Sequence, residues 1–349
     1  MFTGRAVAPK YDLLRPMKTR TSPTFPVYRD LADKLANASN FPDATVAHAL
    51  GTCAGYAYSD QETVAMIMAR MGLEDNHCLM VRESVDAMFI CSTGFLVQSK
   101  CGRVLILCYR GTEPSNFINW LTDADVNPEK VTFPFPGLDS PVEIHGGFYR
   151  NVRATRFAVV TALELALNGQ SVLGTGETMK GPLEAIYITG HSLGGAMAAL
   201  MGAMLIMEPV YKPIADRLRA VYTFGQPMVG NPTFARACAE NPFLGAKVFR
   251  YVFGHDIVPE LPPTASGEFA HFGAEYGLES NSRGNPKRSP RPTTQLSNLA
   301  ELLEAPLGFL AHQIKALRNI PLQHSLYDHG PQHYIAALTP PNVRTEFGD

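Results

Sequence analysis

The feature that most constrains the fold is a glycine-rich pentapeptide, GHSLG at residues 190–194, between a predicted strand and a predicted helix. Leu183 to Thr189 is a β-branched and aromatic run, and Ala196 to Met207 is rich in Ala and Met, which favour a helix. Glycines permit a sharp turn from strand to helix, with Ser192 at its tip in a strained backbone conformation. The context favours a reactive serine, and the alternative is a tight turn that packs a helix on a sheet.

The same region contains 23 residues, 185–207, without a charged side chain, which is long enough for a membrane span. The glycines, Ser192 and His191 would weaken a spanning helix and carry polar groups into lipid. We therefore expect no membrane span there.

The rest of the chain alternates between runs typical of strands and of helices. Such alternation predicts an α/β fold with a central, mostly parallel sheet covered by helices on both faces. Helices are expected over Thr45 to Met71, with an interruption around Gly51 to Tyr58, and over Phe148 to Leu167; strands are expected over Val85 to Gln98 and Arg103 to Tyr109, paired as a hairpin, and later over Ala220 to Phe224 and Lys247 to Phe253.

Composition excludes several classes of protein. The 30 Lys and Arg residues nearly balance 32 Asp and Glu residues, so the formal charge is −2 and no nucleic-acid partner is expected. Because 46% of the 349 residues are apolar and 18% are charged, the chain is globular rather than disordered. The six cysteines form no CxxC pair and lack the spacing of a zinc site, which predicts buried thiols and no metal.

The two ends of the chain differ from its centre. Residues 1–40 are rich in Pro and basic groups without sustained periodicity, so we interpret them as an N-terminal arm and residues 41–349 as one domain. The first 20 residues lack the apolar run that a signal peptide requires, which makes a cytoplasmic location the expectation.

A serine hydroxyl is a weak nucleophile, so a base and an orienting acid are expected after it in the order Ser, Asp, His. Asp256 follows a predicted strand and therefore lies at the sheet edge where α/β folds gather their sites. Asp216 is the competing acid, although neighbouring arginines favour a surface ion pair for it. His329 is favoured as the base by its order and loop position, while His324 and His333 stay open.

At this point the motifs resemble those of the class 3 lipases, the fungal-type triacylglycerol lipase family of α/β hydrolases. The resemblance spans roughly residues 45–340. It rests on six motifs in order: YRGTE at 109–113 with NWLTD at 119–123, HGGF at 145–148, GHSLGG at 190–195, FGQP at 224–227, DIVP at 256–259, and Asp328-His329 with Tyr334 five residues after the histidine.

The resemblance implies the α/β-hydrolase fold and assigns roles to matching positions. Ser192 would be the nucleophile, Asp256 the acid and His329 the base. Thr112 and the backbone N–H of Leu193 would form the oxyanion hole, the donors that stabilise the negative oxygen of the tetrahedral intermediate. The segment with Phe117, Ile118, Trp120 and Leu121 matches the lid or its hinge, and an ordinary buried core position is the alternative for Trp120.

The chain departs from the secreted family members in one large insertion, at about residues 279–325. Residues 281–295 carry four basic residues and no acidic one, and are interpreted as an exposed loop. An apolar stripe follows, which could cover the site, lie on an anionic lipid surface or pack in the core. The stripe consists of Leu299, Leu303, Leu307, Leu310, Ile314 and Leu317.

Together these features predict a serine hydrolase that cleaves acyl esters of lipids through an acyl-enzyme on Ser192. No cofactor is required. The expected partner is a lipid or small ester, with contact to a membrane or lipid-droplet surface. The alternatives are an acyltransferase that uses the same three residues and a lipid-binding module without catalysis.

Overall fold

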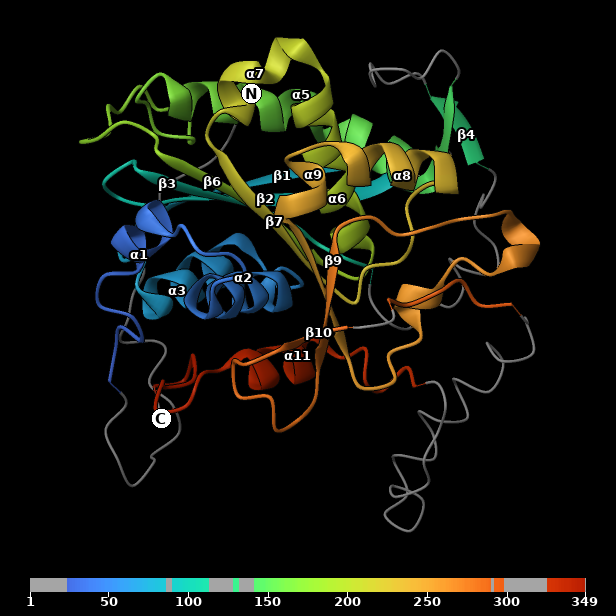
Figure 1. Ribbon diagram of the computed structural model, residues 1–349. Helices are drawn as coiled ribbons and strands as arrows, with labels where there is room; N and C mark the ends of the chain where they lie inside the picture. Colours follow the sequence, from blue (N-terminus) through green and yellow to red (C-terminus); the bar gives the residue numbers. More distant parts are fainter. Residues whose placement is uncertain are drawn as a thin grey trace.

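The central feature of the structure is an eight-stranded sheet with the order β1-β2-β3-β6-β7-β8-β9-β10 (Figure 1). The computed structural model describes residues 24–85, 90–112, 128–131, 141–289, 292–297 and 325–348. Strands β3, β6, β7, β8 and β9 run parallel, while β1, β2 and β10 are antiparallel to their neighbours. The strands span His77–Val85, Ile90–Gln98, Val104–Tyr109, Ala185–His191, Leu218–Phe224, Val248–Phe253, Ala274–Leu278 and Lys287–Arg288, in sheet order.

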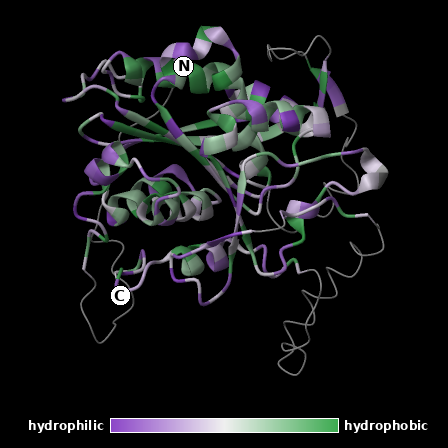
Figure 2. Ribbon diagram, in the orientation of Figure 1, coloured by the Kyte–Doolittle hydropathy of each residue, from purple (hydrophilic) through white to green (hydrophobic). Residues whose placement is uncertain are grey.

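Successive side chains of the buried strands point alternately into two hydrophobic cores, one on each face of the sheet. In β3, Leu105 and Leu107 belong to one core, whereas Ile106 and Cys108 belong to the other. All six β3 residues are buried, as expected of a strand covered on both faces. The central strands are accordingly dominated by hydrophobic residues (Figure 2).

Helices cover both faces. The core that contains Leu105 is completed by α5, α6, α7, α8 and α9, and the core that contains Ile106 by α1, α2, α3 and α11 (Figure 1). On the first face, the helices are α5 (Gly146–Leu167), α6 (Leu193–Met207), α7 (Lys212–Ala215), α8 (Pro232–Glu240) and α9 (Leu244–Lys247). On the second face, they are α1 (Leu31–Asn37), α2 (Ala44–Tyr56), α3 (Gln61–Met71) and α11 (Pro331–Leu338). Short 3₁₀ turns occupy Pro209–Tyr211, Val258–Glu260 and Thr264–Ser266, and a small hairpin pairs β4 (Pro128–Val131) with β5 (Val142–His145).

The predicted α/β class with a mostly parallel sheet is therefore confirmed, with local corrections. The predicted interruption around Gly51 to Tyr58 is found between Tyr56, the last residue of α2, and Gln61, the first of α3. The helix continues through Gly51 and Gly55, which allow α11 to pack closely on α2. Strand β1 was not predicted, because its pattern is irregular. The loop predicted over 281–295 contains the short edge strand β10.

The predicted N-terminal arm is described only from residue 24. Its described part lies against α3 through backbone bonds from Val27 to Arg70 and from Tyr28 to Met71. It also contains α1, whose Leu31 and Leu35 are fully buried, so this stretch is a packed element rather than a purely extended arm.

The uncharged stretch 185–207 is divided between strand β6 and helix α6, both buried in the sheet core. Within the described residues, no single helix is sufficiently long and apolar to cross a membrane. Helix α6 and the segment Pro209–Ala215 are long and apolar enough only when taken together, and they meet at a bend of 91°.

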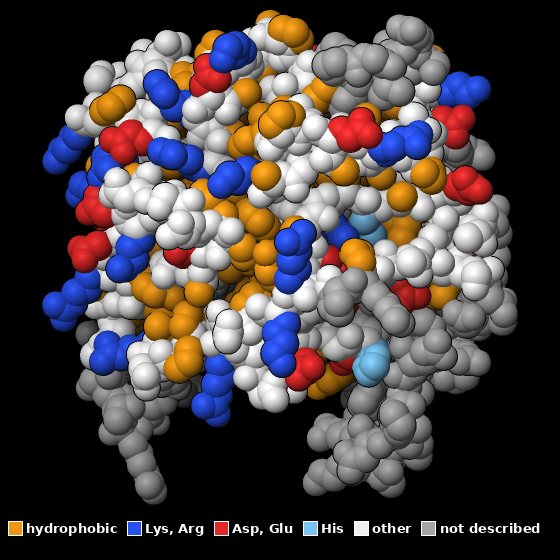
Figure 3. All heavy atoms as spheres, in the orientation of Figure 1, with side chains coloured by type: hydrophobic (Ala, Val, Ile, Leu, Met, Phe, Trp, Pro, Cys, Tyr) orange, Lys and Arg blue, Asp and Glu red, His pale blue; other side chains and the backbone are white. Residues whose placement is uncertain are grey.

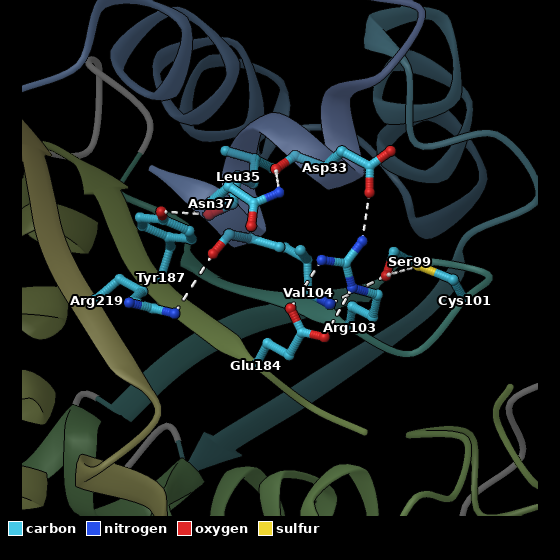
Figure 4. A network of polar contacts seen from close by, with 11 residues as sticks. Asp33, Leu35, Asn37, Ser99, Cys101, Arg103, Val104, Glu184, Tyr187 and Arg219 are labelled. Carbon is cyan, nitrogen blue, oxygen red and sulfur yellow. Dashed lines mark hydrogen bonds and ion pairs between the residues drawn. The ribbon is translucent and has the colours of Figure 1, made fainter. Parts of the chain in front are cut away.

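A polar network attaches α1 to the amino ends of the central strands (Figure 4). The Arg103 guanidinium donates two bonds to the Glu184 carboxylate, at 2.9 and 2.8 Å, and another to Asp33 of α1. Oppositely charged side chains are also interspersed over the molecular face in Figure 3. Such exposed pairs contribute about 0–1 kcal/mol each.

A second ion pair is buried inside the sheet. Arg250 of β8 and Glu275 of β9 are register partners, and their side chains are 2% and 5% exposed with a 3.1 Å contact. Burial lowers the pKa of Arg250 to about 10, against the opposing effect of Glu275. The Arg250 Nε also donates to the Phe272 carbonyl at 3.0 Å, and Glu275 accepts the Thr293 N–H. This pair therefore attaches the start of the insertion to the sheet.

We predict that Arg250→Met lowers the free energy of unfolding by about 3–5 kcal/mol, because it leaves the Glu275 carboxylate buried without its partner. The control, Arg103→Met, removes a guanidinium from a more exposed network and is expected to change stability by about 1 kcal/mol or less. Urea unfolding of both variants measures the difference. Equal losses in the two variants would contradict the distinction.

Candidate active site

The turn between β6 and α6 places Ser192 in an unusual backbone conformation, with φ 61° and ψ −131°. A methyl group at Gly190 would lie 2.2 Å from the Gly194 oxygen, and one at Gly194 would lie 2.2 Å from the Tyr109 oxygen. Only glycine fits at these two positions. The Ser192 N–H donates to the Phe224 oxygen at 2.9 Å, which fixes the turn against β7.

The amino end of α6 directs backbone N–H groups toward this turn. Leu193 is the first residue of α6, so its N–H has no acceptor within the helix. These N–H groups and the helix dipole favour a negative oxygen beside Ser192. The loop that carries Thr112 lies close by, since a methyl group at Gly111 would be 3.1 Å from the Ser192 Cβ. The structure thus gathers Ser192, Leu193 and Thr112.

Asp256 and His329 meet although 73 residues separate them. Asp256 follows β8, His329 lies in the turn before α11, and the His329 Nδ1 is 2.8 Å from the Asp256 Oδ2. The other carboxylate oxygen accepts the Val258 N–H at 2.9 Å. Both residues are buried, at 3% and 4% exposure. The carboxylate accepts the proton on Nδ1, so in neutral His329 the acceptor nitrogen is Nε2.

His191, the residue before Ser192, contacts the base His329 and so connects it to the serine turn. The rings of His191 and His329 lie 4.5 Å apart, and the His191 Nε2 is 2.8 Å from the His329 carbonyl oxygen. Ser192 is 1% exposed, and within the described residues its hydroxyl has no hydrogen-bond partner.

Tyr334 is a site residue whose role the sequence did not indicate. Its hydroxyl donates to the Asp256 Oδ2 and accepts the Phe253 N–H at 3.2 Å. Burial and the Asp256 charge raise the pKa of Tyr334 well above its usual value, so the hydroxyl keeps its proton. The only sequence signal was its spacing from His329.

Asp328 is a second motif residue to which the sequence assigned no role. Its carboxylate accepts the His255 N–H at 2.8 Å, and its own N–H donates to the Ser325 hydroxyl. Ser325 also forms a backbone bridge beside Asp256. These bonds hold the turn that carries His329 against the end of β8.

The competing residues lie elsewhere. Asp216 is exposed and pairs with Lys212 at 2.7 Å rather than with the neighbouring arginines. His255 is exposed, and His333 packs on Phe253 with ring centroids 5.3 Å apart. Several predicted residues lie outside the described part of the chain: His324, the lid candidates Phe117, Ile118, Trp120 and Leu121, and the apolar stripe of the insertion.

Within the described residues, no group of three or more His, Cys, Asp or Glu side chains could hold a metal ion. The six cysteines are free thiols: four are buried, Cys101 is intermediate and Cys91 is exposed.

Gly225 leaves the space that the Asp256 and His329 pair occupies. It follows β7 with φ +56°, and a methyl group there would lie 2.7 Å from the Asp256 Oδ2 and 2.8 Å from the His329 Nδ1. Gly225 belongs to the FGQP motif, which the sequence identified without a physical reason.

The chain is similar in sequence to one known family and to several lipases. Residues 106–266 match the family described as Lipase (class 3), a segment that contains Ser192 and Asp256 but not His329. The chain is 28% identical over 233 residues to triacylglycerol lipase OBL1 of Ricinus communis, covering 56% of this chain and 43% of that protein. It is 31% identical over 193 residues to a lipase of Rhizopus oryzae, covering 54% and 42%. The chain thus spans under half the length of these relatives.

Solved structures show the same fold. A Rhizomucor miehei triacylglyceride lipase superposes with a TM-score of 0.51 and 23% identity, covering 69% of this chain and 82% of that one. A fungal lipase in complex with an inhibitor gives a TM-score of 0.54 at 19% identity, covering 87% and 99%. The predicted α/β-hydrolase fold is therefore confirmed.

We predict that Gly225→Ala reduces the rate at which Ser192 reacts with a fluorophosphonate by at least about 10²-fold, because the methyl group displaces the Asp256 and His329 pair. Gly169→Ala is the matched control: Gly169 also has a positive φ, +69°, but a methyl group there meets nothing within 4 Å. Both variants carry a backbone penalty of about 1–2 kcal/mol. Similar labelling rates in the two variants would contradict the prediction.

Proposed function

We propose that the chain is a class 3 lipase-type enzyme that hydrolyses acyl esters of lipids, on the basis of the family match over residues 106–266 and the fold shared with solved fungal lipases. The observation that carries the proposal is the buried Asp256 and His329 pair beside the strained turn at Ser192. A carboxylate that orients a histidine next to a serine on such a turn is the arrangement that activates the hydroxyl.

In the proposed reaction, the Ser192 oxygen attacks the ester carbonyl while the His329 Nε2 takes the hydroxyl proton. The Asp256 carboxylate keeps the proton on Nδ1 and stabilises the imidazolium that forms. Its second oxygen is occupied by the Val258 N–H, and Tyr334 shares Oδ2, so the carboxylate cannot turn away from His329.

The tetrahedral oxygen would be stabilised by the Leu193 N–H at the start of α6 and by Thr112 beside Gly111. Collapse of this intermediate expels the alcohol, which takes the proton from His329, and leaves an acyl group on Ser192. Water then releases the fatty acid by the same steps.

The substrate class rests on the relatives. The Ricinus communis protein is named a triacylglycerol lipase, and the Rhizopus oryzae protein a lipase. We therefore propose glycerides as substrates, presented at a lipid surface.

Two alternative functions make different predictions in the same assay. An acyltransferase would pass the acyl group to an added alcohol such as glycerol instead of to water. A lipid-binding module would bind liposomes without reacting with a fluorophosphonate, since only an activated serine reacts.

We predict that Ser192→Ala abolishes turnover, because no other group described at the site can form the acyl-enzyme. The assay is a panel of p-nitrophenyl esters of increasing chain length, with glycerides and phospholipids, each with and without an interface. The control, Ser171→Ala, removes a buried hydroxyl that contacts His77 and should retain activity. An active Ser192→Ala protein would overturn the mechanism, and activity on short soluble esters alone would indicate an esterase.

We also predict that Thr112→Val lowers kcat by roughly 10²- to 10³-fold, because the hydroxyl stabilises charge that develops only in the transition state. KM should change little for the same reason. Thr161→Val, on the exposed side of α5, is the matched control. An unchanged kcat would show that backbone N–H groups alone form the oxyanion hole.

A further inference from the structure

A chain of two hydrogen bonds joins three parts of the site and involves none of the reacting atoms. The Tyr58 hydroxyl is 2.8 Å from the His191 Nδ1, and the His191 Nε2 is 2.8 Å from the His329 carbonyl oxygen. Tyr58 lies in the link between α2 and α3, and His191 ends β6. The chain therefore runs from a helical link, through the residue before the nucleophile, to the backbone of the base.

The direction of these bonds follows from the acceptor at one end. A carbonyl oxygen only accepts hydrogen bonds, so the His191 Nε2 must carry a proton and donate a hydrogen bond to the His329 carbonyl oxygen. In a neutral imidazole the other nitrogen, Nδ1, is then an acceptor. Tyr58 must supply the proton of the remaining bond, which makes its hydroxyl the donor.

The surroundings favour these protonation states. Burial, together with the nearby His329, lowers the pKa of His191 well below its usual value, so the ring is neutral. Burial raises the pKa of Tyr58, so its hydroxyl keeps a proton to donate. His191 is 2% exposed, and water does not compete for its two nitrogens.

The Tyr58 hydroxyl also lies against the loop that carries Thr112. A methyl group at Gly111 would be 2.3 Å from this hydroxyl and 2.6 Å from the His191 oxygen. The same phenol thus contacts the oxyanion loop and the ring that holds the base. Its ring packs edge-on against His191, with centroids 5.9 Å apart.

We propose that Tyr58 and His191 are a positioning pair that fixes the distance between the Ser192 hydroxyl and the His329 ring. The inference rests on the proposed function. His191 is joined to Ser192 by a peptide bond and to His329 by a hydrogen bond, so one neutral ring sets the spacing of the two reacting side chains. The His329 carbonyl selects the tautomer of His191 with the proton on Nε2, and Tyr58 donates to the remaining nitrogen, Nδ1, and so holds the ring in place.

Neutrality of His191 also affects the chemistry. When His329 takes the serine proton it becomes a cation, and its ring lies 4.5 Å from His191. A charged His191 would oppose that step by repulsion between like charges in a buried site. The hydroxyl of Tyr58 occupies the nitrogen on which His191 would be protonated.

The test compares Tyr58→Phe with Tyr56→Phe, a matched control two residues earlier whose hydroxyl donates to Glu346 at 2.9 Å, away from Ser192. Tyr58→Phe should lower kcat on a soluble p-nitrophenyl ester by about tenfold with KM within about twofold, since substrate contacts are unchanged. Tyr56→Phe should leave kcat within about twofold. Equal kcat values in the two variants would overturn the proposal.

A second pair of variants tests the His191 bond directly. His191→Phe retains a ring but no donor and should lower kcat by roughly 10²-fold. His191→Gln restores an N–H within reach of His329 and should recover about tenfold of that loss. Equal losses for Phe and Gln would contradict the positioning role.

Nitrogen-15 NMR of the histidine rings provides a readout that does not depend on turnover. Wild-type His191 should be neutral with its proton on Nε2, and Tyr58→Phe should shift the Nδ1 resonance, because that nitrogen loses its hydrogen-bond donor. A His191 protonated on Nδ1 in the wild type would overturn the proposal. Failure of the proposed function is recognised separately, as a wild-type Ser192 that no fluorophosphonate labels.

Discussion

The backbone conformation of Ser192 is the constraint on which the site depends. A non-glycine residue with φ 61° and ψ −131° is strained by about 1–3 kcal/mol and persists only where its surroundings enforce it. Here the enforcing contacts come from Gly190 and Gly194, which let α6 start directly at the end of β6. Since β6 is central in the sheet and α6 is almost wholly buried, the hydrophobic core stabilises the strained turn.

The Asp256 carboxylate performs the matching task for the base. Its oxygens accept hydrogen bonds from His329, Tyr334 and the Val258 backbone N–H. A single buried group therefore joins the end of β8, the turn before α11 and α11 itself. The position of His329 is thereby determined by polar bonds, whereas that of Ser192 is determined by packing.

The sequence predicted the sheet, the turn and Asp256 because each has a local signature: a buried strand, a glycine cluster, and an acid at a strand end. His329 was separated from His324 and His333 only by the family resemblance. The sequence did not predict the roles of Tyr334, Tyr58 and Gly225, because these depend on which segments meet in space. A phenol on a helix is equally typical of core packing, and only the contact with Asp256 or His191 distinguishes the two. The break expected around Gly51 to Tyr58 begins only after Tyr56, because the glycine at position 51 serves the approach of α11 and does not end the helix.

The helices on one face of the sheet therefore contribute to the chemistry without supplying a reacting group. Tyr58 follows α2 and Tyr334 lies on α11, and these two helices pack closely at Gly55, where a methyl group would meet the Ile335 side chain at 2.6 Å. Because both hydroxyls act on the His329 side of the site, the α2 and α11 contact sets how the base sits relative to Ser192. The packing of α2 on α11 therefore supports both the stability of the fold and the geometry of the site. A core substitution at this contact would displace the two hydroxyl groups and, through them, His329.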